Sequence, residues 1–319
     1  MSDTVERVLA GDVRTVARLI SNIDDNVPGV RQQLKELYPH TGRAYIIGIT
    51  GAPGVGKSTL VDRMLGHLRK QGKTVGIIAI DPTSPFSGGA ILGDRIRMQR
   101  HSNDEGVFIR SLATRGHFGG LTHSTRSAID VLDAMGKDYI IVETVGVGQD
   151  EVDIVKSAHT TVIVVIPGMG DDIQAIKAGI LEVGDLFVIN KADREGADRT
   201  LNDLRLMIEM GQKIDEDGGW KPRILKTEAV ADTGVAETLE EIENHRRYII
   251  ESTGSMQLRR RKDRAWEELA DMVKERLIHE VFNRITESGE FEKAVESVVT
   301  GEIDPYTASD ELVVPILDR

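Results

Sequence analysis

Cysteine is absent from the 319-residue chain. Its absence excludes structural disulfides, thiolate metal sites and catalysis by a cysteine nucleophile. A chain without thiols fits the reducing cytoplasm, which is where we expect this protein to act. No apolar run approaches the length of a membrane span, since the most hydrophobic stretch covers only residues 160–167. We likewise expect no secretory signal in the polar N-terminal residues.

Aromatic residues and positive charge are also scarce. Only 4% of the residues are aromatic, so platforms that stack the bases of single-stranded nucleic acid are not expected. The chain has 40 Lys and Arg against 52 Asp and Glu, which gives a formal net charge of −12. Such an acidic chain is a poor general ligand for DNA, RNA or anionic membranes, although local amides and cations can still bind phosphate.

Three regions of the chain differ in their hydrophobic pattern. Residues 1–40 repeat apolar side chains at helical spacing and predict an N-terminal helical cap. Residues 41–253 alternate short β-branched runs with amphipathic stretches, which is typical of an α/β domain with a mostly parallel, doubly wound sheet. In residues 254–319 the strands stop, and apolar side chains from Trp266 to Ile285 recur three or four apart, predicting a long helix with one apolar stripe. A further helix is expected over residues 291–299.

A glycine-rich loop, GAPGVGKS, follows the first predicted strand and precedes a predicted helix. This is the phosphate loop of P-loop NTPases in its required context, and a glycine-rich turn that matches by chance is the alternative. Glycines let backbone amides and the helix N-terminus wrap a phosphate. Lys57 is expected to reach the β- and γ-phosphates, and Ser58 to bind Mg²⁺. The predicted nucleotide-binding residues here are Gly51, Ala52, Pro53, Gly54, Val55, Gly56, Lys57, Ser58 and Thr59.

A second motif, NKAD, ends a late predicted strand at Asn190, Lys191 and Asp193. Guanine presents two hydrogen-bond donors on one edge, which a carboxylate at Asp193 can accept, whereas adenine has no such pair. Lys191 can lie along the base, and Asn190 can tie this loop to the phosphate loop. A helix-capping turn is the alternative. After the next strand, the segment Thr227, Glu228 and Ala229 stands where such proteins supply backbone amides to the guanine oxygen.

Two acidic residues, Asp81 and Glu143, lie at the ends of apolar predicted strands. Ligands bind at that edge of a parallel sheet, so these carboxylates are candidates for Mg²⁺, with solvated strand-end acids as the alternative. The sequence ETVG that begins at Glu143 replaces the DxxG of many GTPases, and the amide of Gly146 would then sense the γ-phosphate. Asp94, in a proline- and glycine-rich segment, either approaches the metal or caps a helix.

The residue after Gly146 is Val147, where Ras-like enzymes have the glutamine that orients the attacking water. Valine cannot do this, which predicts slow intrinsic hydrolysis or a water held by another residue. Gln149 and Gln174 are candidates for that task.

Six motifs together resemble the MeaB/ArgK family of GTPases, in the same order. They are GAPGVGKSTL, DPTSPFSGGAILGDRIRM, RGHFGGL, ETVGVGQDE, PGMGDDIQAIKAG and NKAD. The resemblance implies a homodimeric GTPase that serves as a chaperone for cobalamin-dependent methylmalonyl-CoA mutase, gates the loading of adenosylcobalamin and protects the mutase.

The resemblance also implies roles for particular residues. It places Lys57, Asp81, Asp94 and Glu143 at the GTP–Mg²⁺ site. It makes residues 167–177, which include Gln174 and Lys177, a further switch that responds to the mutase. The C-terminal helices match the region that the family uses for dimerisation, although packing of the apolar stripe against the core explains the pattern equally well. Glu228 departs from the small residue that the family commonly has in its guanine loop.

Three alternative functions remain for a chain with these motifs, and features of the sequence disfavour each of them. A kinase linked to arginine transport is disfavoured because kinases seldom read guanine. A nickel metallochaperone GTPase is disfavoured because the chain has no Cys/His cluster. A signal-recognition-type targeting GTPase is disfavoured by the acidic charge and by the lack of a methionine-rich RNA-binding domain.

Overall fold

The computed structural model describes residues 1–81, 101, 103–113, 120–144, 146, 158–168, 183–211, 219–251 and 254–317. They form two compact units, Met1–Gln257 and Leu258–Arg319.

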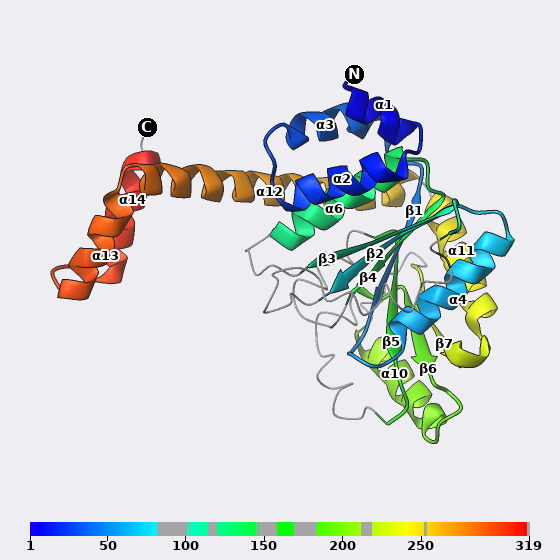
Figure 1. Ribbon diagram of the computed structural model, residues 1–319. Coiled ribbons are helices and arrows are strands. Elements are labelled where there is room, and N and C mark those ends of the chain that lie inside the picture. Colours follow the sequence, from blue (N-terminus) through cyan, green and yellow to red (C-terminus); the bar gives the residue numbers. More distant parts are fainter. Residues whose placement is uncertain are drawn as a thin grey trace. The chain divides into compact units, whose positions relative to one another are not determined.

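The first unit is built around a parallel sheet (Figure 1). Among the described residues its strand order is β3-β2-β4-β1-β5-β6-β7, and all neighbouring pairs run parallel. The strands are β1 (Tyr45–Thr50), β2 (Val75–Asp81), β3 (Val107–Ala113), β4 (Tyr139–Glu143), β5 (Thr160–Val165), β6 (Leu186–Asn190) and β7 (Arg223–Thr227). The predicted α/β class, with a parallel sheet and helices at both ends of the chain, is confirmed.

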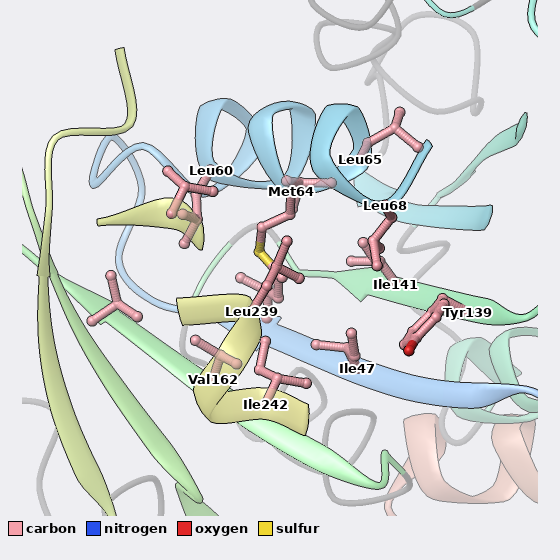
Figure 2. Close-up of a cluster of buried hydrophobic side chains, with 14 of the residues drawn as sticks. Ile47, Leu60, Met64, Leu65, Leu68, Tyr139, Ile141, Val162, Leu239 and Ile242 are labelled. Carbon is pink, nitrogen blue, oxygen red and sulfur yellow. The ribbon is translucent and has the colours of Figure 1, made fainter. Parts of the chain in front are cut away.

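One face of the sheet packs against helices α4 (Lys57–Lys70) and α11 (Val235–Glu251). Figure 2 shows Met64 of α4 and Leu239 of α11 meeting Ile47 of β1 in this cluster. Strands β2, β4, β5 and β6 are buried at every position because helices cover both of their faces. This explains why they appear in the sequence as continuous apolar runs rather than as alternating ones.

The opposite face packs against α6 (Gly120–Ala134) and, towards β6, against α10 (Ala197–Gly211). The N-terminal helices lie over α6 and complete this cluster (Figure 1). They are α1 (Asp3–Leu9), α2 (Val13–Asp24) and α3 (Val30–Leu37), followed by the short helix η1 (Tyr38–His40). Their inward side chains, Val5, Val8, Val16 and Ile20, are buried, as the helical spacing predicted.

A carboxylate of α6 binds the segment that connects the N-terminal helices to β1. Asp133 of α6 accepts hydrogen bonds from the backbone N–H groups of Gly42 at 2.6 Å, Arg43 at 3.1 Å and Ala44 at 2.9 Å. These residues lead directly into β1. The start of β1, which ends in the phosphate loop, is therefore anchored to a helix on the far side of the sheet.

The strand order places the topological switch point of the sheet at β1. β1 lies between β4 and β5, and the chain adds β2, β3 and β4 on one side before it adds β5, β6 and β7 on the other. Ligands of open parallel sheets bind at the carboxyl ends of the strands where the direction of winding changes. The loop after β1 occupies that point.

The second unit is helical throughout the part that the structure describes. It contains most of α12 (Gly254–Glu287), together with α13 (Glu290–Thr300) and α14 (Pro305–Leu317), and α14 lies beyond the helices expected from the sequence. The stripe on α12 is largely exposed, with 74% of Trp266 and 56% of Leu277 accessible, whereas Ile285 is buried. Among the described helices, none combines the length and apolar character that a membrane span requires.

Candidate functional site

The loop between β1 and α4 leaves no space for a side chain at two of its glycines. Gly51 has φ +152°, and an added Cβ there would lie 2.2 Å from the carbonyl oxygen of Val164. Gly56 has φ +98°, and its Cβ would lie 2.3 Å from Nδ2 of Asn190. The loop is thus pressed against β5 on one side and against the NKAD segment on the other, which gives its glycines a steric reason.

Lys57 is the first residue of α4, and its buried side chain extends back into this loop. Its Nζ donates to the carbonyl of Gly51 at 2.7 Å and to that of Ala52 at 3.1 Å. The helix is capped by Gly56, which has no side chain to accept from the first-turn N–H groups. A fixed cation and a helix N-terminus therefore share one small region, an arrangement suited to phosphate.

A hydroxyl in the first turn of α4 contacts one of two carboxylates that end neighbouring strands. Ser58 Oγ donates to Glu143 Oε1 at 2.7 Å, and this contact is buried. Glu143 ends β4, and Asp81 ends the adjacent β2, where it is only 3% exposed. Hydroxyl and carboxylate oxygens are the ligands that Mg²⁺ prefers.

The small number of acidic groups is also compatible with Mg²⁺. No group of three or more His, Cys, Asp or Glu side chains with metal-binding geometry occurs among the described residues. Mg²⁺ usually keeps several waters and is held by one or two carboxylates together with substrate phosphates, so it does not need such a cluster. The residues present therefore fit the ion.

Asn190, at the end of β6, connects three segments. Its Nδ2 donates to the carbonyl of Val55 in the phosphate loop at 2.8 Å. Its Oδ1 accepts from Thr227 Oγ1 and from the Ala229 N–H, each at 3.1 Å. One buried side chain thus holds the phosphate loop, the NKAD segment and the residues after β7 together.

The side chains of Lys191 and Asp193, the other two polar residues of NKAD, have different environments. Lys191 has a left-handed backbone, φ 55°, and its Nζ donates to the carbonyl of Gly54 at 2.8 Å. Its side chain therefore spans the phosphate loop. Asp193 is exposed to solvent. The backbone between them is held by the Ala192 N–H, which donates to the Thr227 carbonyl at 3.0 Å.

The predicted guanine-facing amides have partners inside the protein. The Glu228 N–H donates to the Thr233 carbonyl at 3.0 Å, and the Ala229 N–H donates to Asn190. Contact between the Ala229 amide and a guanine oxygen therefore requires an exchange of partner. The sequence placed this segment at the site but did not indicate these internal hydrogen bonds.

Two threonines that the sequence analysis did not single out hold Gly146. The hydroxyls of Thr50 and Thr144 lie 2.9 and 3.1 Å from its carbonyl oxygen, and both threonines are buried. Thr50 is the last residue of β1, so the end of the first strand and the ETVG segment are in direct contact. A threonine that ends an apolar strand was the only sequence signal for this role.

Several predicted residues lie outside the described part of the chain. These are Asp94, Val147, Gln149, Gln174 and Lys177. Their expected roles in metal binding, water positioning and switching stay predictions.

The family model described as methylmalonyl-CoA mutase-associated GTPase MeaB matches residues 16–286. A GTPase of Pyrococcus abyssi is 50% identical, covering 99% of this chain and 97% of the relative. GTPase ArgK of Escherichia coli is 31% identical, covering 98% and 95%. The crystal structure of LAO/AO transport system kinase has a TM-score of 0.69 and 26% identity, covering 99% of this chain and 97% of that one. The resemblance seen in the motifs is confirmed, and the chain belongs to the MeaB family of GTPases.

Proposed function

We propose that this GTPase is a chaperone of a cobalamin-dependent acyl-CoA mutase, with methylmalonyl-CoA mutase as the first candidate. In this role it gates the loading of adenosylcobalamin and protects the mutase in the cytoplasm. The observation that carries the nucleotide part is the side chain of Asn190, which joins the phosphate loop to the NKAD segment. The mutase part is supported by the description of the family, whose model covers residues 16–286.

Each residue of the site has a proposed task in binding GTP. The backbone N–H groups of residues 51–59, apart from Pro53, which has none, surround the phosphates. Lys57 exchanges the loop carbonyls for the β- and γ-phosphate oxygens. The carboxylate of Asp193 accepts the two donors on the guanine edge, and Lys191 lies along the base. The segment Thr227, Glu228 and Ala229 borders the guanine oxygen, where the Ala229 amide is the donor.

Ser58, Asp81, Asp94 and Glu143 are the proposed residues that hold Mg²⁺ directly or through water. The bound ion neutralises charge on the β- and γ-phosphates. Ser58 already lies against Glu143, so the hydroxyl and the carboxylate need little movement to act together. Gly146 follows in the same segment, and its amide is proposed to sense the γ-phosphate.

Lys57→Ala is expected to lower the rate of GTP hydrolysis by about 10²-fold or more, because the charge that develops on the γ-phosphate loses its fixed cation. Single-turnover hydrolysis of labelled GTP measures this. Lys70→Ala is the matched control, since Lys70 ends the same helix and is exposed. Equal rates in the Lys57 variant and the control would place the phosphate site elsewhere.

The C-terminal unit is proposed to form a homodimer through α12. Trp266, Leu269, Val273 and Leu277 recur three or four positions apart on α12, and each is at least 48% exposed in the single chain. Exposed apolar side chains that gather on one element are typical of an interaction site. Pairing of two such helices would remove these side chains from water.

The dimer is tested by changing this stripe. Trp266→Asp combined with Leu277→Asp is expected to give a monomer that still binds GDP, as is truncation after Ser255. Val299→Asp, in α13, is the control, because Val299 is 80% exposed but lies outside the stripe. Light scattering at micromolar concentration measures the mass. An unaltered full-length chain that runs at the mass of one chain contradicts the proposal.

The mutase is tested by affinity purification from the native cell in non-hydrolysable GTP, followed by identification of co-purifying proteins. A cobalamin-dependent acyl-CoA mutase is the expected partner. The second candidate function is phosphotransfer, because the solved relative at 26% identity is named a transport system kinase. In that case the γ-phosphate would appear on an acceptor other than water.

A further inference from the structure

Arg63 of α4 contacts the segment that follows β7. Its Nε donates to the carbonyl of Ala229 at 3.2 Å, and its Nη2 donates to the carbonyl of Val230 at 2.8 Å. The two contacts come from different nitrogens of one planar guanidinium, whose fixed geometry holds the two successive carbonyls in one orientation. Arg63 lies about two helical turns after the phosphate loop, so one helix is attached to both parts of the site.

His67 lies one turn further along the same face of α4 and contacts the same segment of the chain. Its Nε2 lies 2.9 Å from Oδ1 of Asp232, a residue with a left-handed backbone, φ 62°. The segment between the two contacts is closed on itself, because the N–H groups of Glu228 and Thr233 each donate to the carbonyl of the other. Residues 228–233 are thus a small closed loop held along α4.

Ala229, within this loop, is held at three points. Its N–H donates to Asn190 Oδ1, its carbonyl accepts from Arg63, and its side chain is 2% exposed in the cluster that contains Leu60 and Val235. The peptide groups on both sides of Ala229 therefore have one orientation. Since α4 begins at the phosphate loop, the orientation of these peptide groups is fixed relative to that loop.

We propose that Arg63, assisted by His67, is a positioning residue for base specificity. It holds the 228–233 loop so that the Ala229 amide faces the oxygen on position 6 of guanine when it leaves Asn190. This rests on the proposed function of that loop in guanine binding. Arg63 does not touch the nucleotide; it acts on the base through the placement of one amide.

The test compares GDP with 6-thio-GDP, in which a sulfur that accepts hydrogen bonds poorly replaces the position-6 oxygen. The wild type is expected to prefer GDP in calorimetric titration. Arg63→Met is expected to lose about tenfold in GDP affinity with little change for 6-thio-GDP, so that the preference falls by the same factor. Arg69→Met is the matched control, because Arg69 lies on the same helix but pairs with Asp104 at 2.8 Å. The control is expected to keep the wild-type preference.

Different outcomes would contradict the guanine site and the role of Arg63. A wild type that binds GDP and ADP equally overturns the guanine site itself. A wild type that selects GDP over ADP but does not distinguish GDP from 6-thio-GDP, or an Arg63→Met variant that keeps the full preference, overturns the role of Arg63. If Arg63→Met does not fold, Arg63→Gln keeps a polar side chain that is too short to reproduce both contacts of the guanidinium, and an undiminished preference in that variant has the same meaning.

Discussion

Replacing Asp193 with asparagine is expected to lower the affinity for GDP by at least about 10³-fold and to shift the preference to xanthine nucleotides. The carboxylate is proposed to accept two hydrogen bonds from guanine, and an amide side chain presents a donor to one of them. Sites built to hydrogen-bond a substrate group reject a mismatched partner by about 10⁴-fold or more. Xanthine carries an oxygen in place of the 2-amino group, so the asparagine donor finds an acceptor there.

Asp198→Asn is the control for this exchange. Asp198 lies at the start of α10, close in sequence to the NKAD motif, but its carboxylate pairs with Lys226 at 2.6 Å. It is expected to leave the preference for GDP over XDP unchanged. Calorimetric titration of both variants with GDP and XDP measures the effect. An Asp193→Asn protein that still selects GDP would show that another residue reads the base.

The second large effect is expected from the mutase. With Val147 in place of a water-orienting glutamine, the free protein is expected to hydrolyse GTP slowly, and a partner that moves residues 167–177 can complete the site. Lys177 would then stabilise charge on the phosphoryl oxygens as an arginine finger does, which contributes about 10³-fold or more. Gln174, in the same segment, is the proposed residue for holding water.

Single-turnover hydrolysis with and without a cobalamin-dependent acyl-CoA mutase from the same cell measures this stimulation. Lys177→Ala is expected to lose it, whereas Lys70→Ala, changed at an exposed lysine of α4, is expected to keep it. Absence of stimulation by any such mutase would contradict the proposed partner, while the membership of the GTPase family would stand.

The fold was largely predictable because its strongest signals are local. A strand covered on both faces appears as a continuous apolar run, which identified β2, β4, β5 and β6. The phosphate loop was identified by residue types that follow one another in the chain. The helix α14 was missed because it contains a proline at position 315 and follows another short helix.

The contacts within the site were less predictable, since they join residues far apart in the sequence. Asn190 and Val55 are 135 positions apart, and Arg63 and Ala229 are 166 apart. Periodicity describes which face of one element is apolar, but it carries no information about which loops of different elements meet. The tie from Asn190 to the phosphate loop could be inferred from the NKAD motif. The contact from Arg63 could not, because an arginine on a helix surface is usually only solvated.

We propose that Asn190 brings a phosphate loop and a guanine-reading loop into one nucleotide site. Calorimetric titration of the unaltered protein with GDP, ADP and the non-hydrolysable analogues of GTP and ATP, in the presence of Mg²⁺, tests it most directly. Both guanine nucleotides are expected to bind, and the adenine nucleotides are expected to show no measurable binding at the same concentrations. Comparable affinities for the guanine and adenine nucleotides would contradict it.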